Sequence, residues 1–170
     1  MRLRCAIIED LRPDAQALER ALLAASAHSC RLQCTLYASG SEFLRRGALS
    51  EQDVIFLDIC MPGLDGIETA RRLRGEDPRI PIVFVTSSEE YVWDALPLHP
   101  FDYLRKPYDD ARVRKLLDDL LAALGRPEPE LELRVARQLI QVPFRRIHYA
   151  LAQNHFVSVC TDEGEHRATA

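Results

Sequence analysis

The chain has 170 residues, of which 47% are hydrophobic and 28% are charged, and its formal net charge is −4. This composition is typical of a globular protein with room for one good core and part of a second. No basic-flanked apolar segment opens the chain and no apolar run is long enough to cross a bilayer. We therefore expect a cytoplasmic protein that is neither exported nor inserted in a membrane.

Charge and cysteine content argue against a nucleic-acid-binding surface in the first part of the chain, a disulfide framework and a zinc site. Residues 1–130 carry 17 Lys and Arg against 22 Asp and Glu, which argues against a nucleic-acid-binding surface there, whereas residues 131–170 carry 5 against 4. The five cysteines favour small core residues in a reducing compartment over a disulfide framework. His28, Cys30 and Cys34 lack a fourth ligand at zinc spacing, so we predict no zinc site.

Apolar runs alternate with helix-forming segments up to about residue 124. The first run, at 4–8, is continuous rather than alternating, which indicates a strand buried on both faces. We expect strands at 4–8, 32–37, 53–57, 82–85 and 101–104. Helices are expected from Pro13, after Ser39, from Gly66 to a stop formed by Gly75 and Pro78, over 89–96 and over 109–124. The alternation predicts an α/β fold in which helices cover both faces of a doubly wound, five-stranded parallel sheet.

The pattern changes after residue 125. Residues 126–130 read RPEPE, a short, stiff and charged linker. Strands are then expected at 131–135, 139–143 and 156–160. We therefore predict a first domain over 1–124, a linker over 125–130 and a short all-β segment over 131–170.

Polar side chains follow the ends of four of the expected parallel strands. Asp58 comes directly after a buried strand and opens a Met-Pro-Gly turn. Glu9 and Asp10 follow the first strand, Thr86 ends the fourth, and Lys106 follows the fifth. Each has an ordinary explanation on its own, such as a turn residue or a charge near a helix start. Because ligands of such sheets bind beyond the carboxyl ends of the strands, we expect them to form one site.

This set of residues suits phosphoryl transfer to a carboxylate. The reaction brings two anionic groups together, so it needs a cation and fixed positive charge. Glu9, Asp10 and Asp58 make an all-oxygen pocket suited to Mg²⁺, with Asp58 as the nucleophile. Lys106, one of only 2 lysines beside 20 arginines, supplies a compact positive charge, and Thr86 supplies a hydroxyl.

The motifs around these strand ends carry a family resemblance. They are IIED at 7–10, LDICMPGLDG at 57–66, VTS at 85–87 and FDYLRKP at 101–107. With them, residues 1–124 resemble the receiver domain of two-component response regulators, which have a flavodoxin-like fold. The resemblance implies that a sensor histidine kinase phosphorylates Asp58 and that the phosphoryl group is slowly self-hydrolysed. It also implies that Glu9, Asp10, Asp58 and the backbone carbonyl of Cys60 hold Mg²⁺.

The resemblance further implies a switch. Thr86 would move toward the phosphoryl group and Tyr103 would turn inward behind it, repacking the face made by the fourth helix and fifth strand. The Lys106–Pro107 peptide would be cis. Two prolines, Pro97 and Pro100, fall where receivers usually continue a helix, so we expect a shortened fourth helix and an altered dimer surface. The neighbouring aromatic residues, Tyr91 and Trp93, are expected to pack.

The segment after the linker resembles the beginning of a LytTR-type DNA-binding domain. The matching parts are PFRRIHY at 143–149 and the strand-turn-strand at 154–167. The resemblance implies that 131–170 is the first part of such a domain, in a truncated form or a natural fragment, with Asn154 and His155 in a loop that contacts DNA. The later strands have no counterpart, which leaves an open sheet edge that a homodimer could cover. We expect promoter DNA to be a partner of the full-length protein and DNA binding by this chain to be weak or absent.

Together these features predict a phosphoacceptor switch, not a metabolic enzyme, that controls transcription through a LytTR domain in its full-length form. One alternative is a receiver that acts as a protein-docking or dimerisation module without direct DNA binding. Another is an Mg²⁺-dependent phosphatase with Asp58 as nucleophile. The phosphatase is disfavoured because Cys60, two residues after Asp58, is not a general acid.

Overall fold

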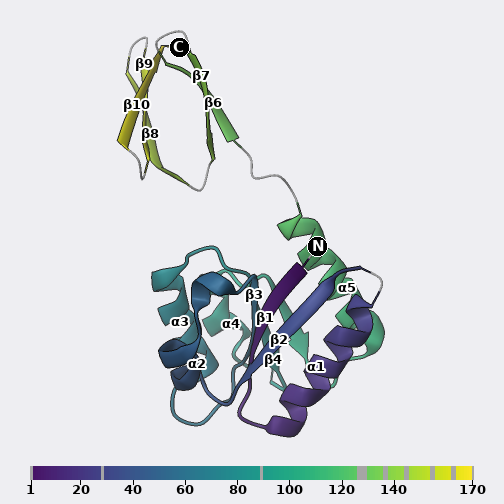
Figure 1. Cartoon of the computed structure of the whole chain (residues 1–170). Helices are drawn as coiled ribbons and strands as arrows, with labels where there is room; N and C mark the ends of the chain where they lie inside the picture. The colour runs from purple at the N-terminus through teal and green to yellow at the C-terminus, as the bar shows by residue number, and fades with distance from the viewer. Residues whose placement is uncertain are drawn as a thin grey trace. The chain divides into compact units, whose positions relative to one another are not determined.

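The computed structural model describes two compact units, Met1–Ala122 and Ala123–Ala170 (Figure 1). The residues that it describes are 2–27, 29–88, 90–125, 130–135, 138–143, 146–153, 156–161 and 164–169. Within these ranges no helix is both long and apolar enough to cross a membrane.

The first unit is built on a five-stranded parallel sheet. Its strands are β1 (Arg2–Ile8), β2 (Arg31–Tyr37), β3 (Val54–Asp58), β4 (Ile82–Thr86) and β5 (Asp102–Arg105), in the order β2-β1-β3-β4-β5. The predicted α/β fold is therefore confirmed. The winding reverses between β1 and β3, and at such a reversal the strand ends leave a crevice for ligands.

Helices cover both faces of this sheet (Figure 1). They are α1 (Arg12–Ser26), α2 (Gly40–Arg46), α3 (Gly66–Glu76), α4 (Val92–Ala95) and α5 (Asp110–Leu124), with single 3₁₀ turns η1 (Leu49–Glu51) and η2 (Leu96–Leu98). Helices α1 and α5 lie on one face, and α2 and α3 lie on the other. Ser39 caps α2 as its sequence predicts, since its side chain accepts a hydrogen bond from the backbone N–H of Glu42 (3.1 Å).

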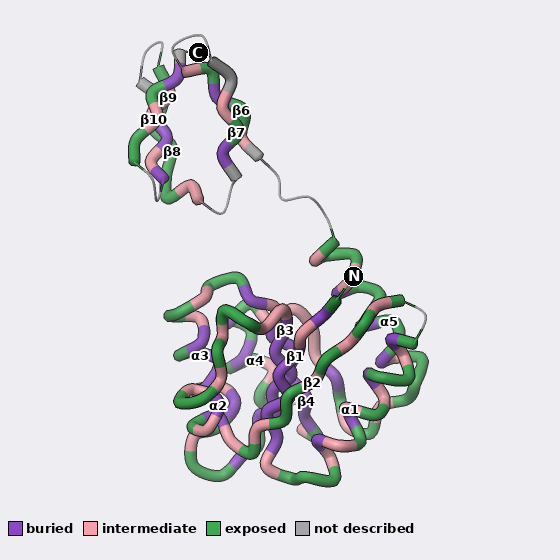
Figure 2. Tube along the Cα trace, viewed as in Figure 1, coloured by how far each residue is buried: buried purple, intermediate pink, exposed green. Residues whose placement is uncertain are grey.

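The core lies in the middle of the sheet, where the strands are buried along their length (Figure 2). All residues of β3 and β4 are buried, as continuous apolar runs predict for central parallel strands. On the α2 and α3 face, Phe43, Phe84 and Leu73 are almost inaccessible to solvent. Each such side chain contributes about 1.5–3 kcal/mol on burial, so the central strands give the strand ends a rigid base.

The fourth helix is as short as the prolines predict. Helix α4 has 4 residues and passes into η2, which has Pro97 in its first turn and ends at His99 with a φ of +48°. Pro97 has no N–H to donate, which is tolerated in a first turn. The expectation that Trp93 packs is wrong, because its side chain is 78% exposed. A four-residue helix buries only one side, and Ala95 occupies that side.

Helix α3 contains two glycines, Gly66 and Gly75, and their surroundings differ. A Cβ on Gly66 would lie 2.1 Å from the carbonyl oxygen of Asp58, whereas a Cβ on Gly75 would meet nothing within 4 Å. Gly75 and Pro78 were expected to end the helix, and α3 ends between them, at Glu76. The carboxylate of Asp77 accepts hydrogen bonds from the N–H groups of Arg79 and Ile80 (2.8 and 3.2 Å) and so favours a turn after the helix.

We expect Gly66→Ala to lower the free energy of unfolding by about 2 kcal/mol, because the new methyl group must displace backbone atoms at the end of β3. Gly75→Ala in the same helix is the matched control, and it should raise the free energy of unfolding by about 0.5–1 kcal/mol. Urea denaturation of the two variants measures both. Equal stabilities would show that close packing at Gly66 is not a constraint.

The second unit consists of antiparallel strands. One hairpin pairs β6 (Glu130–Val135) with β7 (Gln138–Pro143), and a separate sheet has the order β10-β9-β8, from β8 (Ile147–Gln153), β9 (Phe156–Thr161) and β10 (Gly164–Thr169). A small core joins them, formed by the buried side chains of Leu133, Val142, Val159 and Ala168. Strand β8 was not predicted, because its alanines, Ala150 and Ala152, give a weak strand signal.

Candidate functional site

The sheet brings the predicted polar residues to one edge of the first unit. Glu9 follows β1, Asp58 ends β3, Thr86 ends β4 and Lys106 follows β5, so all four stand at carboxyl ends of parallel strands. Backbone hydrogen bonds hold these ends in place. The N–H of Glu9 donates to the carbonyl of Tyr37 (3.0 Å), and the N–H of Lys106 donates to the carbonyl of Thr86 (2.8 Å).

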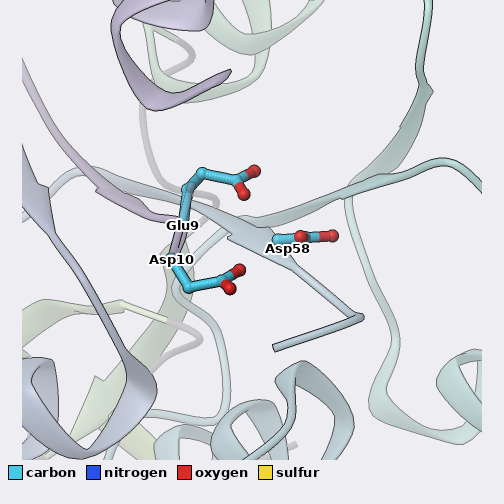
Figure 3. Close-up of side chains that lie close together, drawn as sticks. All are labelled: Glu9, Asp10 and Asp58. Carbon is cyan, nitrogen blue, oxygen red and sulfur yellow. The ribbon is translucent and has the colours of Figure 1, made fainter. Parts of the chain in front are cut away.

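Three carboxylates gather at this edge. One oxygen atom from each of Glu9, Asp10 and Asp58 lies within 4.8 Å of the others, and Figure 3 shows the side chains side by side at the strand ends. Glu9 and Asp58 are 5% and 6% exposed. Anionic groups so close and so poorly hydrated repel one another, so the arrangement requires a compensating cation.

Lys106 provides part of that compensation. Its ammonium Nζ lies 2.6 Å from Oε2 of Glu9, 2.9 Å from Oδ2 of Asp14 and 3.7 Å from Oδ2 of Asp58. Burial alone would lower the pKa of Lys106, but the hydrogen bonds to Glu9 and Asp14 and the charge of Asp58 raise it above its ordinary value. Lys106 therefore remains a fixed positive charge throughout the physiological pH range.

Asp14 is a member of this site that the sequence pattern did not single out. It was expected only to open helix α1, where it lies in the first turn. The distance from Lys106 to Asp14 is shorter than that to Asp58. No spacing in the sequence indicates this position, because Glu9 and Asp10 precede α1 and therefore share no helix face with Asp14.

The loop after β3 lies beside Asp58. The backbone N–H of Cys60 donates to Oδ1 of Asp58 (3.3 Å), while Oδ2 faces Lys106. The side chain of Cys60 is exposed. The proposed role of its backbone carbonyl as a metal ligand stays a prediction.

The ionisation of Glu9 is disfavoured by its surroundings in the site. Burial and the charge of Asp58 raise the pKa of Glu9, and the ion pair with Lys106 only partly offsets this. A raised pKa in the folded state means that ionised Glu9 disfavours folding above that pKa. This destabilisation vanishes below the ordinary Glu pKa of about 4.3, because Glu9 is then protonated in both the folded and the unfolded state.

We therefore expect Glu9→Gln to be more stable than the wild type at pH 7 without metal, and the difference to vanish below about pH 4. Glu68→Gln is the control with the opposite sign, because hydrogen bonds from Arg72 and Arg71 lower the pKa of Glu68. Urea denaturation in EDTA at both pH values measures the effects. A Glu9→Gln protein that is less stable at pH 7 would contradict the raised pKa.

The donor set fits a hard divalent cation. Glu9, Asp10 and Asp58 offer only oxygen ligands, which suit Mg²⁺, and they leave room in its coordination shell for water and phosphate. Within the described ranges this is the only group of three or more acidic, Cys or His side chains close enough to hold a metal. Of the residues considered for zinc, His28 lies outside those ranges.

A comparison with known families agrees with this geometry. The sequence profile of the response regulator receiver domain matches residues 6–118, about two thirds of the chain. The chain belongs to the response regulator receiver family. The receiver domain thus includes every strand end that carries a site residue.

Relatives and solved structures extend the comparison. Transcriptional regulatory protein YpdB of Escherichia coli K12 is 32% identical over 122 residues, covering 64% of this chain and 50% of that protein. Sensory transduction protein LytT of Oceanobacillus iheyensis is 35% identical over 94 residues, covering 54% and 38%. The response regulatory domain of mrkE from Klebsiella pneumoniae has a TM-score of 0.65 at 29% identity, covering 74% of this chain and all of that one. The chain spans half or less of the length of these two curated relatives.

The residues predicted to form a switch are Thr86 and Tyr103. The hydroxyl of Thr86 bonds with Ser88, donating to its carbonyl and accepting from its N–H (both 3.1 Å). The ring of Tyr103 stacks on Phe84 (5.7 Å between centroids), and its hydroxyl donates to the carbonyl of Val92 (3.3 Å). Thr86 and Tyr103 line one cavity of about 460 Å³, together with Ser88, Val92, Trp93 and Arg105. Thr86 and Tyr103 thus border the same cavity.

Two further predictions have different outcomes. The Lys106–Pro107 peptide is cis, as predicted. Asn154 and His155, the predicted DNA contacts, lie outside the described residues.

Proposed function

We propose that this receiver is a phosphorylation switch in which Asp58 accepts a phosphoryl group from a sensor histidine kinase in the presence of Mg²⁺. The observation that carries the proposal is the meeting of three carboxylates with one lysine at the edge of the sheet. Asp58 stands at the end of a fully buried strand, which holds the nucleophile rigidly. We propose a switch rather than a metabolic enzyme, because the acceptor of the phosphoryl group is a side chain of the protein itself.

The chain's own residues account for the transfer. An oxygen of Asp58 attacks the phosphorus, the new O–P bond forms, and the P–N bond to the kinase's phosphohistidine breaks. The N–H of Cys60 orients the attacking carboxylate through Oδ1. Lys106 and the hydroxyl of Thr86 stabilise the charge on the transferred oxygens. Mg²⁺ held by Glu9, Asp10 and Asp58 would neutralise the approaching anion.

Phosphorylation then changes the neighbouring face. Thr86 exchanges its bonds with Ser88 for a bond to the phosphoryl group, which draws the hydroxyl away from the cavity. Tyr103 gives up its hydrogen bond to Val92 and moves into the space that Thr86 leaves. These movements repack α4 against β5. Phosphorylation, a local change of charge, thus selects between two packing states of this face.

The proposed output is control of transcription through a LytTR-type DNA-binding domain in the longer protein. The antiparallel strands β6 to β10 and the names of YpdB and LytT support this output. Promoter DNA would be the partner of the longer protein. This chain would bind it weakly or not at all.

Phosphorylation is tested by incubating the chain with phosphoramidate, with MgCl₂ or with EDTA, and measuring its intact mass. We expect a phosphoryl mass increase with Mg²⁺ only, on the peptide that carries Asp58. Modification that is equal in EDTA, or that maps to another peptide, would overturn the proposal. Multiple turnover on phosphomonoesters would instead favour the phosphatase.

The alternative output is protein docking without DNA binding, and one observation favours it. The exposed Trp93 borders the cavity next to Thr86 and Tyr103, which is a suitable place for a partner. Salt-sensitive DNA binding by the longer protein, but not by this chain, supports the LytTR output. Capture of a partner by the phosphorylated receiver, with no DNA binding by either form, supports docking.

A further inference from the structure

Two cysteines face each other on neighbouring strands, away from the phosphorylation site. Cys5 of β1 and Cys34 of β2 are register partners in the parallel sheet. Their sulfur atoms lie 3.0 Å apart. From this juxtaposition we propose that Cys5 and Cys34 form a reversible disulfide that joins β2 to β1 when the protein meets hydrogen peroxide.

The backbone geometry permits the bond. Neighbouring strands are about 4.8 Å apart, within the Cα separation of about 4.4–6.8 Å that disulfides span. The sulfur atoms need to approach by about 1 Å to reach a bond length of about 2.05 Å. The proposal therefore requires the two side chains to rotate toward each other while the strands keep their register.

The environments of the two thiols assign them different roles. Cys5 is fully buried, whereas Cys34 lies on the edge strand β2 and is partly exposed. The thiol of Cys5 donates a hydrogen bond to the sulfur of Cys34, which lowers the pKa of Cys34 and raises that of Cys5. Peroxide can therefore reach Cys34, the sulfur that more readily becomes a thiolate.

The chemistry balances with peroxide as the oxidant. The Cys34 thiolate attacks one peroxide oxygen, which breaks the O–O bond, forms a sulfenic acid and releases hydroxide. The sulfur of Cys5 then attacks the sulfenic sulfur, forming the S–S bond and expelling the hydroxyl group as water. The two thiols lose two electrons and two protons, and the peroxide leaves as two molecules of water. A reducing compartment makes such a bond transient, as redox-sensing disulfides are.

The bond would have a structural consequence for the receiver. It closes a loop that contains helix α1, which packs on the strands and carries Asp14 in its first turn. An added cross-link removes freedom from the unfolded chain, so the oxidised receiver should be harder to unfold. The oxidised protein should therefore melt at a higher temperature than the reduced protein, and added thiol should reverse the difference.

Peptide mapping tests the proposal on the full chain. The protein is treated with hydrogen peroxide, alkylated and digested, with Cys34→Ser as the test variant and Cys30→Ser as the matched control. We expect a linked Cys5–Cys34 peptide in the wild type and in Cys30→Ser but not in Cys34→Ser, and it should disappear when thiol is added. Full alkylation of both cysteines after peroxide, or a link from Cys34 to Cys30, would overturn the proposal.

A second measurement uses only the wild type, so its result cannot come from a folding defect of the variants. The wild type alone is melted before oxidation, after oxidation and after reduction by thiol. The expected result is a rise in melting temperature that thiol abolishes, together with the linked peptide. A linked peptide that forms only after thermal unfolding would show that the folded sheet does not make the bond, and it would also overturn the proposal.

Discussion

Asp58→Asn is expected to abolish phosphorylation by phosphoramidate and Mg²⁺, leaving no mass increase above background. The amide retains the shape of the side chain, and its oxygen can still accept the Cys60 N–H. It removes the nucleophilic oxygen, so no acyl phosphate can form. Intact mass spectrometry of both proteins under the same conditions measures the effect.

Asp65→Asn is the matched control for this experiment. Asp65 is an exposed acid seven residues away that caps α3 by accepting the N–H of Glu68 (2.8 Å), and asparagine caps helices equally well. Its phosphorylation should equal that of the wild type. If Asp58→Asn still gained the phosphoryl group, another side chain would be the acceptor and the proposed switch would be wrong.

Lys106→Met should slow phosphorylation by about 100- to 1,000-fold, the usual cost of losing one fixed group that stabilises transferred charge. It should also destabilise the metal-free protein by about 3 kcal/mol, because Glu9 and Asp58 remain buried without their cation. Methionine keeps most of the aliphatic volume of lysine, so the effect isolates the charge. Stopped-flow phosphorylation and urea denaturation provide the two values.

The second lysine of the chain is the natural control. Lys115 pairs with Asp119 on the surface of α5, and its side chain is 70% exposed. Such a pair contributes at most about 1 kcal/mol, so Lys115→Met should change neither the rate nor the stability appreciably. Added Mg²⁺ should restore part of the stability of Lys106→Met and none of that of Lys115→Met. Similar losses of rate and stability in the two variants would indicate that any lysine has this effect through its charge and that the position of Lys106 in the site does not matter.

The sheet and its site could be predicted from the sequence because each prediction rested on a short, continuous stretch of residues. Continuous apolar runs such as that of β3 identify buried strands, and the residue that follows such a run must lie at the sheet edge. The positions of Asp58 and Thr86 follow from this alone, whereas Lys106 follows β5, which is less apolar and less buried. Asp14 was missed because its role depends on the direction in which the Lys106 side chain turns, and no spacing in the sequence determines that direction.

Other features depended on tertiary contacts. Trp93 is an apolar residue beside other apolar residues, and only the shortness of α4 explains why it stays exposed. Cys5 and Cys34 each read as small core residues, because register between strands 29 positions apart cannot be inferred from either strand alone. Strand β8 pairs through its backbone with β9, so its weak side-chain signal did not prevent it from forming.

The exposure of Trp93 has a practical consequence. It is the only tryptophan in the chain, and it borders the same cavity as Thr86 and Tyr103. The indole ring therefore senses the polarity of the space that the proposed rearrangement reshapes. The protein carries its own fluorophore at the face of the proposed rearrangement, and we expect its emission spectrum to report that rearrangement in real time without an attached dye.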